Sequence, residues 1–260
     1  MIQIIKNLYA TYSKHLRMKV PYLIDKIRGK NISEIDVSGN KLKLYTETPY
    51  HHHIARGLRK KTYEKQAIEE WINEAKQKKC ILDIGGYNGF YGLSAGIMNP
   101  EAKVFIFEPD QINAKHIREN IKINKLNNVS LIELAVSNKE GYVIFGGHNG
   151  GTGGRIGAGN RKIETITLDK FVEKEKCHPD LIKIDVEGAE MEVFEGGQEV
   201  WKNATQGLTI MLEVHIILLK KHFGRSEAEL MELIKKMDNL KFEKMDDNNG
   251  VTYHVKIKKT

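Results

Sequence analysis

The chain has 260 residues, of which 40% are hydrophobic and 29% charged, with 41 Lys and Arg against 34 Asp and Glu. Such a chain can bury a full core, and none of its apolar stretches reaches the roughly 18–20 residues that cross a bilayer. The two cysteines provide no disulfide framework or metal-type spacing, and no signal-peptide pattern is seen, so we expect a globular, cytoplasmic protein.

The net charge of +7 raises the question of an acidic partner. The basic residues are spread out and lack the aromatic interleaving of nucleic-acid motifs, so a nucleic-acid partner is not expected. Solvated basic faces are the preferred interpretation, and attraction to acidic substrates or to a membrane surface is the alternative. Oligomeric state is not indicated by the sequence.

Residues 1–29 carry apolar side chains at helical spacing, and Pro21 is expected to break this helix. The helix is expected to pack on the main domain, with peripheral contact to a membrane or a partner chain as the alternative. Residues 32–47 alternate around a Ser-Gly-Asn turn and predict a β-hairpin. We assign both to an N-terminal extension, residues 1–59, ahead of a main domain at 60–260.

Three consecutive histidines, His51 to His53, follow the hairpin. Adjacent residues of a regular element do not converge on one ion, and the i, i+4 spacing of a zinc helix is missing, so a metal site is not expected here. Contact with substrate is the alternative.

The segment KCILDIGGYNG, residues 79–89, is the most informative part of the chain. It predicts a buried strand that leads through Asp83 into a turn containing Gly85, Gly86 and Gly89, where the backbone can approach a ligand closely. The next strand, AKVFIFEPD, ends in Glu108, nineteen residues after Gly89. An acidic residue at that place is suited to the two hydroxyls of a ribose, so the two segments predict a nucleoside-binding α/β unit.

The spacing differs from the GxGxxG pattern of dinucleotide sites. A carboxylate at Asp83, beside the turn, suits the cationic amino acid end of S-adenosylmethionine better than a phosphate. This favours a methyltransferase over a dinucleotide oxidoreductase. A purely structural role of the glycines, in a tight turn, is the remaining alternative.

Residues 111–125 predict an amphipathic helix and residues 129–138 the third strand, with Ala135 to Ser137 near the adenine. Nine glycines follow between 141 and 159. We interpret this stretch as a mobile loop between strands, a kind of segment that often forms a lid or a substrate rim, with simple disorder as the alternative.

Acidic residues gather after two further strands. Asp185, Glu187 and Glu190 lie at the carboxyl end of the apolar strand at 181–186, and we expect Lys183 to be their counter-ion because buried acids need one. The strand LTIMLEVH, residues 208–215, ends in the same way, with Glu213 and His215. A helix at 226–238 and an antiparallel strand pair then complete the sheet.

At this point the chain resembles the FkbM-type S-adenosylmethionine-dependent methyltransferases, over roughly residues 60 to 220. The matching motifs are TYE at 62–64, ILDIGGYNG at 81–89, FIFEPD at 105–110, ITLD at 166–169, LIKIDVEGAE at 181–190 and LEVH at 212–215. One departure is the pair Gly86-Tyr87, where the family commonly has alanine and asparagine. The resemblance implies O-methylation, often of sugars in glycoconjugates or of secondary metabolites, and places Glu64 at the start of a cofactor-facing helix.

The fold expected is therefore α/β, a Rossmann-like class I methyltransferase. Its sheet is mostly parallel and seven-stranded, with an antiparallel C-terminal strand pair, and an N-terminal helix and hairpin precede it. We expect S-adenosylmethionine to be bound by Glu64, Asp83, Gly85, Gly86, Tyr87, Gly89, Glu108, Pro109, Ala135, Val136 and Asp185.

Methyl transfer to an alcohol needs a base for the hydroxyl proton. Asp185 is the first candidate, followed by Glu187 and by His215, whose ordinary pKa suits neutral pH. A divalent cation on Asp185, Glu187 and Glu213 is an alternative that we do not favour. The segment DVEGAE lacks the proline turn used for amine methylation of nucleobases, so a hydroxyl acceptor on a sugar is preferred. A nucleic-acid methyltransferase and a catalytically silent binding protein are the alternatives.

Overall fold

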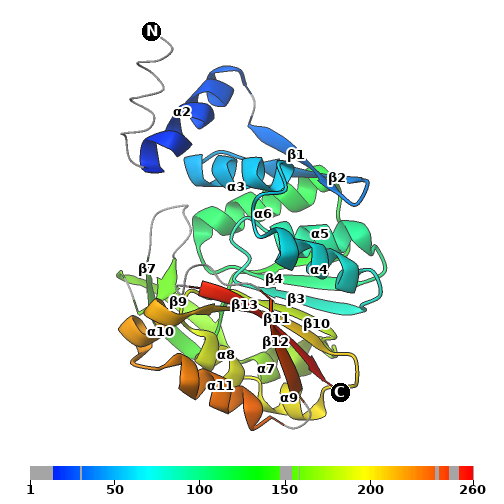
Figure 1. Cartoon of the computed structure of the whole chain (residues 1–260), viewed down its shortest axis with the longest axis vertical. Helices are drawn as coiled ribbons and strands as arrows, with labels where there is room; N and C mark the ends of the chain where they lie inside the picture. Colours follow the sequence, from blue (N-terminus) through cyan, green and yellow to red (C-terminus); the bar gives the residue numbers. More distant parts are fainter. Residues whose placement is uncertain are drawn as a thin grey trace.

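The computed structural model describes residues 14–29, 31–146, 154–157, 159–237, 240–245 and 252–259. A seven-stranded sheet in the order β12-β13-β11-β10-β3-β4-β5 forms its centre (Figure 1). The strands are β3 (Cys80–Ile84), β4 (Lys103–Phe107), β5 (Val129–Ile132), β10 (Leu181–Ile184), β11 (Thr209–His215), β12 (Leu240–Lys244) and β13 (Thr252–Lys259). Of these seven strands, only β13 runs in the direction opposite to the others. The predicted mostly parallel sheet with an antiparallel C-terminal pair is confirmed.

The central strands are apolar because both faces of the sheet are covered. In β3, Cys80, Leu82 and Ile84 belong to one hydrophobic cluster and Ile81 to the other. Helices α4 (Lys65–Ala75), α5 (Phe90–Met98) and α6 (Gln111–Asn124) lie on one side of the sheet. The other side carries α7 (Leu168–Glu175), α8 (Glu190–Glu195), α9 (Gln198–Asn203), α10 (Ile216–Phe223) and α11 (Glu227–Lys235) (Figure 1). The result is the three-layered, Rossmann-like arrangement that the sequence predicts.

The N-terminal part forms α2 (Lys14–Ile27), the hairpin β1 (Ile32–Val37) and β2 (Asn40–Tyr45), and α3 (Pro49–Arg59). The hairpin is confirmed, and its two turn residues both have positive φ, 49° at Ser38 and 88° at Gly39, as tight hairpin turns require. Buried side chains of the hairpin and α3, such as Leu42 and Ile54, share a hydrophobic cluster with Leu93 of α5.

The expectation that Pro21 ends the first helix is wrong, because α2 continues through it to Ile27. Two contacts after the proline hold the helix: Tyr22 donates a hydrogen bond to the carbonyl oxygen of Glu47 (2.6 Å), and Asp25 pairs with His52 (2.9 Å). Packing thus compensates for the backbone hydrogen bond that proline cannot make. The expected helical stretch at 1–13 lies outside the described residues. None of the helices that the structure describes has the length and apolar content to cross a membrane.

Two expectations after α6 need correction. Residues 129–138 are not one strand: the chain leaves the large sheet after Ile132, and β6 (Ala135–Val136) pairs instead with β9 (Arg161–Ile166). The glycine-rich stretch is not simply a loop, because β7 (Gly141–Gly146) pairs with both β9 and β8 (Arg155–Ile156). Together these strands form a second sheet in the order β6-β9-β7-β8. Residues 147–153 of the expected mobile loop lie outside the described part.

Candidate functional site

A cavity of about 600 Å³ lies at the carboxyl ends of β3, β4, β10 and β11. Ligands of open α/β sheets bind at this edge, beside the strand from which the chain winds in both directions, here β3. Most of the predicted site residues line it: Glu64, Gly85, Tyr87, Glu108, Pro109, Ala135, Val136, Asp185, Glu187 and His215. The fold therefore brings together the glycine turn and the strand ends, which lie far apart in the sequence, as expected.

Asp83, Gly86 and Gly89 do not line this cavity. Asp83 is buried and accepts a hydrogen bond from the backbone N–H of Gly92 (2.8 Å), so it holds the first turn of α5; burial raises its pKa to about 6. Gly89 has a φ of 80° and caps the same helix. These residues build the turn from β3 to α5 rather than the wall of the cavity.

Gly85 has a packing role as well. Its φ is 88°, and a Cβ placed on it would lie 1.8 Å from the carbonyl oxygen of Asp185. The close backbone approach expected for a ligand is therefore used to bring the ends of β3 and β10 together.

Glu108 joins the end of β4 to the glycine turn. Its two carboxylate oxygens accept hydrogen bonds from the backbone N–H groups of Tyr87 (2.8 Å) and Asp110 (2.7 Å). Burial raises the pKa of Glu108 to about 8, although these two hydrogen bonds oppose the shift. A carboxyl group held in this way, in a cavity that Leu134 and Val136 also line, fits a ribose and its attached base.

Lys183 pairs with two acidic residues of the cavity wall. Its side chain is fully buried, and its ammonium lies 3.5 Å from Asp185 and 3.8 Å from Glu213. It also lies 5.1 Å from the centre of the Tyr91 ring, and no hydrogen bond of its ammonium is found among the described residues. The predicted counter-ion role of Lys183 agrees with this geometry.

The pKa values of the two carboxyl groups beside Lys183 are shifted in opposite directions. Burial and the neighbouring Glu213 raise the pKa of Asp185 to about 8. Burial opposes ionisation of Glu213 too, but the hydrogen bond with His254 and the charges of Lys183 and His215 outweigh it and lower the pKa of Glu213.

His215 lies among four carboxylates. Its Nδ1 is hydrogen-bonded to Glu190 (2.8 Å), and its Nε2 lies 3.7 Å from Asp185, 3.8 Å from Glu187 and 3.8 Å from Glu213. Burial disfavours the imidazolium, but the hydrogen bond to Glu190 and the charge of Asp185 outweigh it and raise the pKa of His215 to about 10. The expectation that His215 titrates near neutral pH is wrong, because its neighbours keep it protonated.

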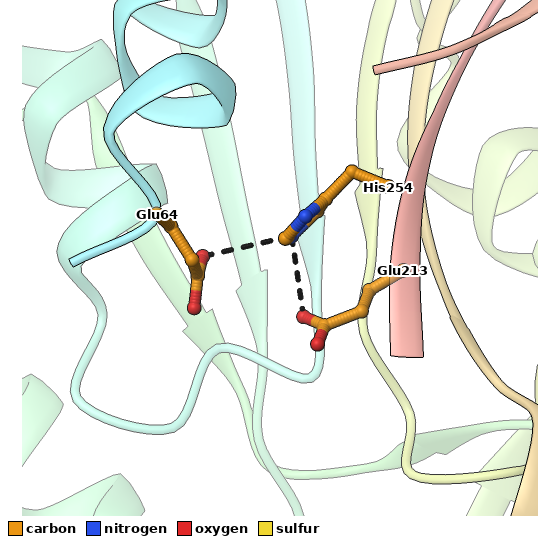
Figure 2. Close-up of side chains that lie close together, drawn as sticks. All are labelled: Glu64, Glu213 and His254. Carbon is orange, nitrogen blue, oxygen red and sulfur yellow. Dashed lines mark ion pairs between the residues drawn. The ribbon is translucent and has the colours of Figure 1, made fainter. Parts of the chain in front are cut away.

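A second cluster joins three distant parts of the chain (Figure 2). The His254 ring lies between two carboxylates, 3.4 Å from Glu213 and 3.7 Å from Glu64. Glu64 stands at the start of α4 with left-handed backbone angles (φ 38°) and accepts a hydrogen bond from the Tyr91 hydroxyl (2.7 Å). Sequence reasoning missed His254, because only the register of β13 against β11 places it opposite Glu213.

Two groups in the described part of the chain have ligand atoms close enough to share a metal ion. They are Glu64, Glu213 and His254, and Asp185, Glu213 and His215. Both share Glu213 with the Lys183 ammonium, which already supplies positive charge there. The histidine run does not form such a group: His52 pairs with Asp25, and the His51 ring packs on those of Tyr87 and His116.

Two methyltransferases are similar in sequence to this chain. The chain is 29% identical over 187 residues to the hexuronic acid methyltransferase AglP of Haloferax volcanii, covering 67% of this chain and 73% of the relative. It is 30% identical over 169 residues to the 2-O-methyltransferase NoeI of Sinorhizobium fredii, covering 56% and 69%.

A solved structure shows the same fold. The O-methyltransferase from Bacillus cereus in complex with SAH matches with a TM-score of 0.51 at 16% identity, over 76% of this chain and 81% of that one. The profile of the methyltransferase FkbM domain matches residues 83–244, which contain both the glycine turn and the acidic strand ends. The chain belongs to the FkbM family of S-adenosylmethionine-dependent methyltransferases.

Proposed function

We propose that this enzyme methylates a hydroxyl group of a sugar or glycoconjugate and that Asp185 accepts the hydroxyl proton. The observation that carries the proposal is that Asp185 and Glu108 line the same cavity. Asp185 lies among charged side chains that suit a sugar acceptor. Glu108 shares the cavity with apolar side chains that suit the cofactor. AglP is named for a hexuronic acid and NoeI for 2-O-methylation, which supports a sugar hydroxyl and not a nucleic acid as the acceptor.

The cavity residues divide into two sets. Glu108 is placed to accept hydrogen bonds from ribose hydroxyls, Leu134 and Val136 to contact the adenine, and Glu64 to meet the cationic amino acid end of the cofactor. When bound, S-adenosylmethionine supplies an electrophilic methyl group on a sulfonium. The remaining work of the protein is to hold the acceptor in line and to receive one proton.

Asp185 suits the role of base better than its neighbours. Its pKa is raised to about 8, so its carboxylate is a stronger proton acceptor than an ordinary one, and the share of this ionised form grows as the pH rises toward 8. His215 is already protonated at neutral pH, so we assign it a positioning role: its charge favours the ionised form of Asp185. Glu187, which is part-exposed at the same wall, is placed to accept a hydrogen bond from another hydroxyl of the sugar.

The test compares Asp185→Asn with Glu187→Gln. Methyl transfer is followed by mass spectrometry on a panel of uronic acids, neutral sugars and their glycosides, and cofactor affinity by calorimetry. We expect Asp185→Asn to lower kcat by about 10²–10⁴-fold with cofactor affinity nearly unchanged, because general base catalysis contributes this much. Glu187→Gln should raise KM more than it lowers kcat. Unchanged kcat in Asp185→Asn would remove the base assignment, and transfer to RNA but to none of the sugars would remove the acceptor class.

A further inference from the structure

The net positive charge of the chain lies at one end of the sequence, although basic residues occur throughout. Residues 1–59 contain eleven Lys and Arg against four Asp and Glu, whereas residues 60–260 contain 30 of each. The whole net charge of +7 therefore belongs to the N-terminal stretch, and the rest of the chain is neutral. Such an asymmetry favours an acidic partner for the N-terminal part.

Helix α2 has one face that packs on the protein. Met18 is buried, the Tyr22 hydroxyl donates to the carbonyl oxygen of Glu47, and Asp25 pairs with His52 of α3. These residues follow one another at intervals of three and four, so they share one side of the helix. The helix is thereby held on the extension at the end of the molecule away from α9 and α11 (Figure 1).

The opposite face of α2 is apolar and exposed. Leu23, Ile24 and Ile27 are 50%, 43% and 85% exposed, an unusual gathering of large aliphatic side chains on one helix turn. Exposed basic residues flank this stripe, Lys19 and Lys26 on one side and Arg28 on the other. We call this set of six residues the α2 face.

We propose that the α2 face docks the enzyme onto an anionic lipid surface. Aliphatic side chains enter the boundary between headgroups and acyl chains, while flanking Lys and Arg keep their charges at the level of the headgroups. A membrane interface thus accounts for both the stripe and its basic borders. A nucleic acid would meet the charges but not the aliphatic side chains, and a second copy of the α2 face would bring like charges together.

Flotation of the full-length protein with vesicles tests the proposal. We expect binding to vesicles of phosphatidylcholine with about one-third phosphatidylglycerol, weakening with added salt, and little binding to pure phosphatidylcholine. Each basic residue near the surface contributes about fivefold to the partition coefficient, so Lys26→Glu with Arg28→Glu should lower it by at least about 25-fold. Ile24→Ser with Ile27→Ser should lower it without weakening the salt dependence.

Matched controls distinguish binding through the α2 face from nonspecific binding to vesicles. Lys174→Glu with Lys176→Glu makes the same change in charge, at the same spacing, near the end of α7. Tyr142→Ser with Ile144→Ser removes two exposed apolar side chains of β7, which are 60% and 48% exposed. Both controls should bind like the wild type. The proposal is overturned if wild-type protein does not float with anionic vesicles, if the controls lose as much binding as the α2 variants, or if Ile24→Ser with Ile27→Ser converts a dimer into a monomer.

Discussion

The ammonium nitrogen of Lys183 lies 3.5 Å from a carboxylate oxygen of Asp185, and the lysine side chain has no exposure to solvent. A buried charge of this kind is tolerated because its neighbours carry the opposite charge. The pair affects the ionisation of Asp185: burial and Glu213 raise the pKa of this carboxyl group, and the charge of Lys183 opposes the shift.

Lys183→Met should therefore change the pH dependence of methyl transfer. Loss of the cation raises the pKa of Asp185 further, so the acidic limb of the kcat profile should move up by about one pH unit or more. The free energy of unfolding should fall by roughly 3–5 kcal/mol, because carboxylates are left without their partner. Lys78→Met is the matched control: it removes a lysine 3.4 Å from Glu74, away from the cavity. A limb that moves equally in both variants, or in neither, contradicts the assignment.

Chelation tests whether a cation takes part. We expect methyl transfer to survive dialysis against EDTA, because Lys183 and His215 already place positive charge beside Asp185 and Glu213. Loss of activity on dialysis, with recovery on adding Mg²⁺, would instead assign a metal ion to Asp185, Glu213 and His215, and isothermal titration of that ion into Asp185→Asn would then show no binding.

The contribution of His51 to stability should fall as the pH drops from about 6.5 toward 3. Burial and the nearby His116 lower the pKa of His51 from 6.5 to about 3, with opposing effects from Asn113 and Asp110. Above the unfolded value, His51 is neutral in both states and contributes nothing to the pH dependence. Below it, the unfolded chain binds a proton that the folded protein excludes, and each pH unit costs about 1.4 kcal/mol.

Urea unfolding at pH 7, 6 and 5 measures this slope. His51→Asn should flatten it, whereas the exposed His178→Asn should leave it unchanged. The variant must be compared with the wild type because Glu108 acts in the opposite direction. Its pKa is raised to about 8, so its contribution to the stability of the folded protein decreases as the pH rises. Equal slopes in the wild type and His51→Asn would show that His51 is not the group responsible.

Alanine substitutions at Gly85 and Gly207 distinguish the cost of backbone strain from the cost of steric crowding. Both have strongly positive φ, 88° and 99°, but a Cβ on Gly85 would lie 1.8 Å from Asp185, whereas one on Gly207 would have no atom within 4 Å. Gly207→Ala should cost about 1–2 kcal/mol, the price of the left-handed backbone alone. Gly85→Ala should cost roughly 3 kcal/mol or more, since β3 and β10 must also separate. Similar losses of unfolding free energy for the two would contradict the close approach.

The sequence predicted those parts of the molecule that local pattern determines. The apolar strand Cys80–Ile84 followed by a glycine turn, and the acids Glu108 and Asp185 at strand ends, were placed correctly at one edge of the sheet. The position of Asp83 was not predicted. Its side chain could turn either to the cavity or to the first turn of α5, and it accepts a hydrogen bond from Gly92 in that turn. Local pattern does not contain that choice.

Long-range pairing accounts for the other differences. The antiparallel C-terminal strands were expected, but the partner of each residue was not, so His254 escaped notice opposite Glu213. The pKa of His215 depends on carboxylates from β10, α8 and β11 meeting around one ring. The glycine-rich stretch gave no sign that Gly141–Gly146 would pair on both sides.

The place of β13 in the sheet has a consequence for biosynthesis. This strand inserts between β11 and β12, and it follows all the other described strands in chain order. A nascent polypeptide that has emerged from the ribosome only as far as β12 already contains Glu108, Asp185 and Glu213, yet Glu213 still lacks the His254 imidazole that faces it. The pocket therefore gains its complete charge arrangement only when β13 pairs with β11.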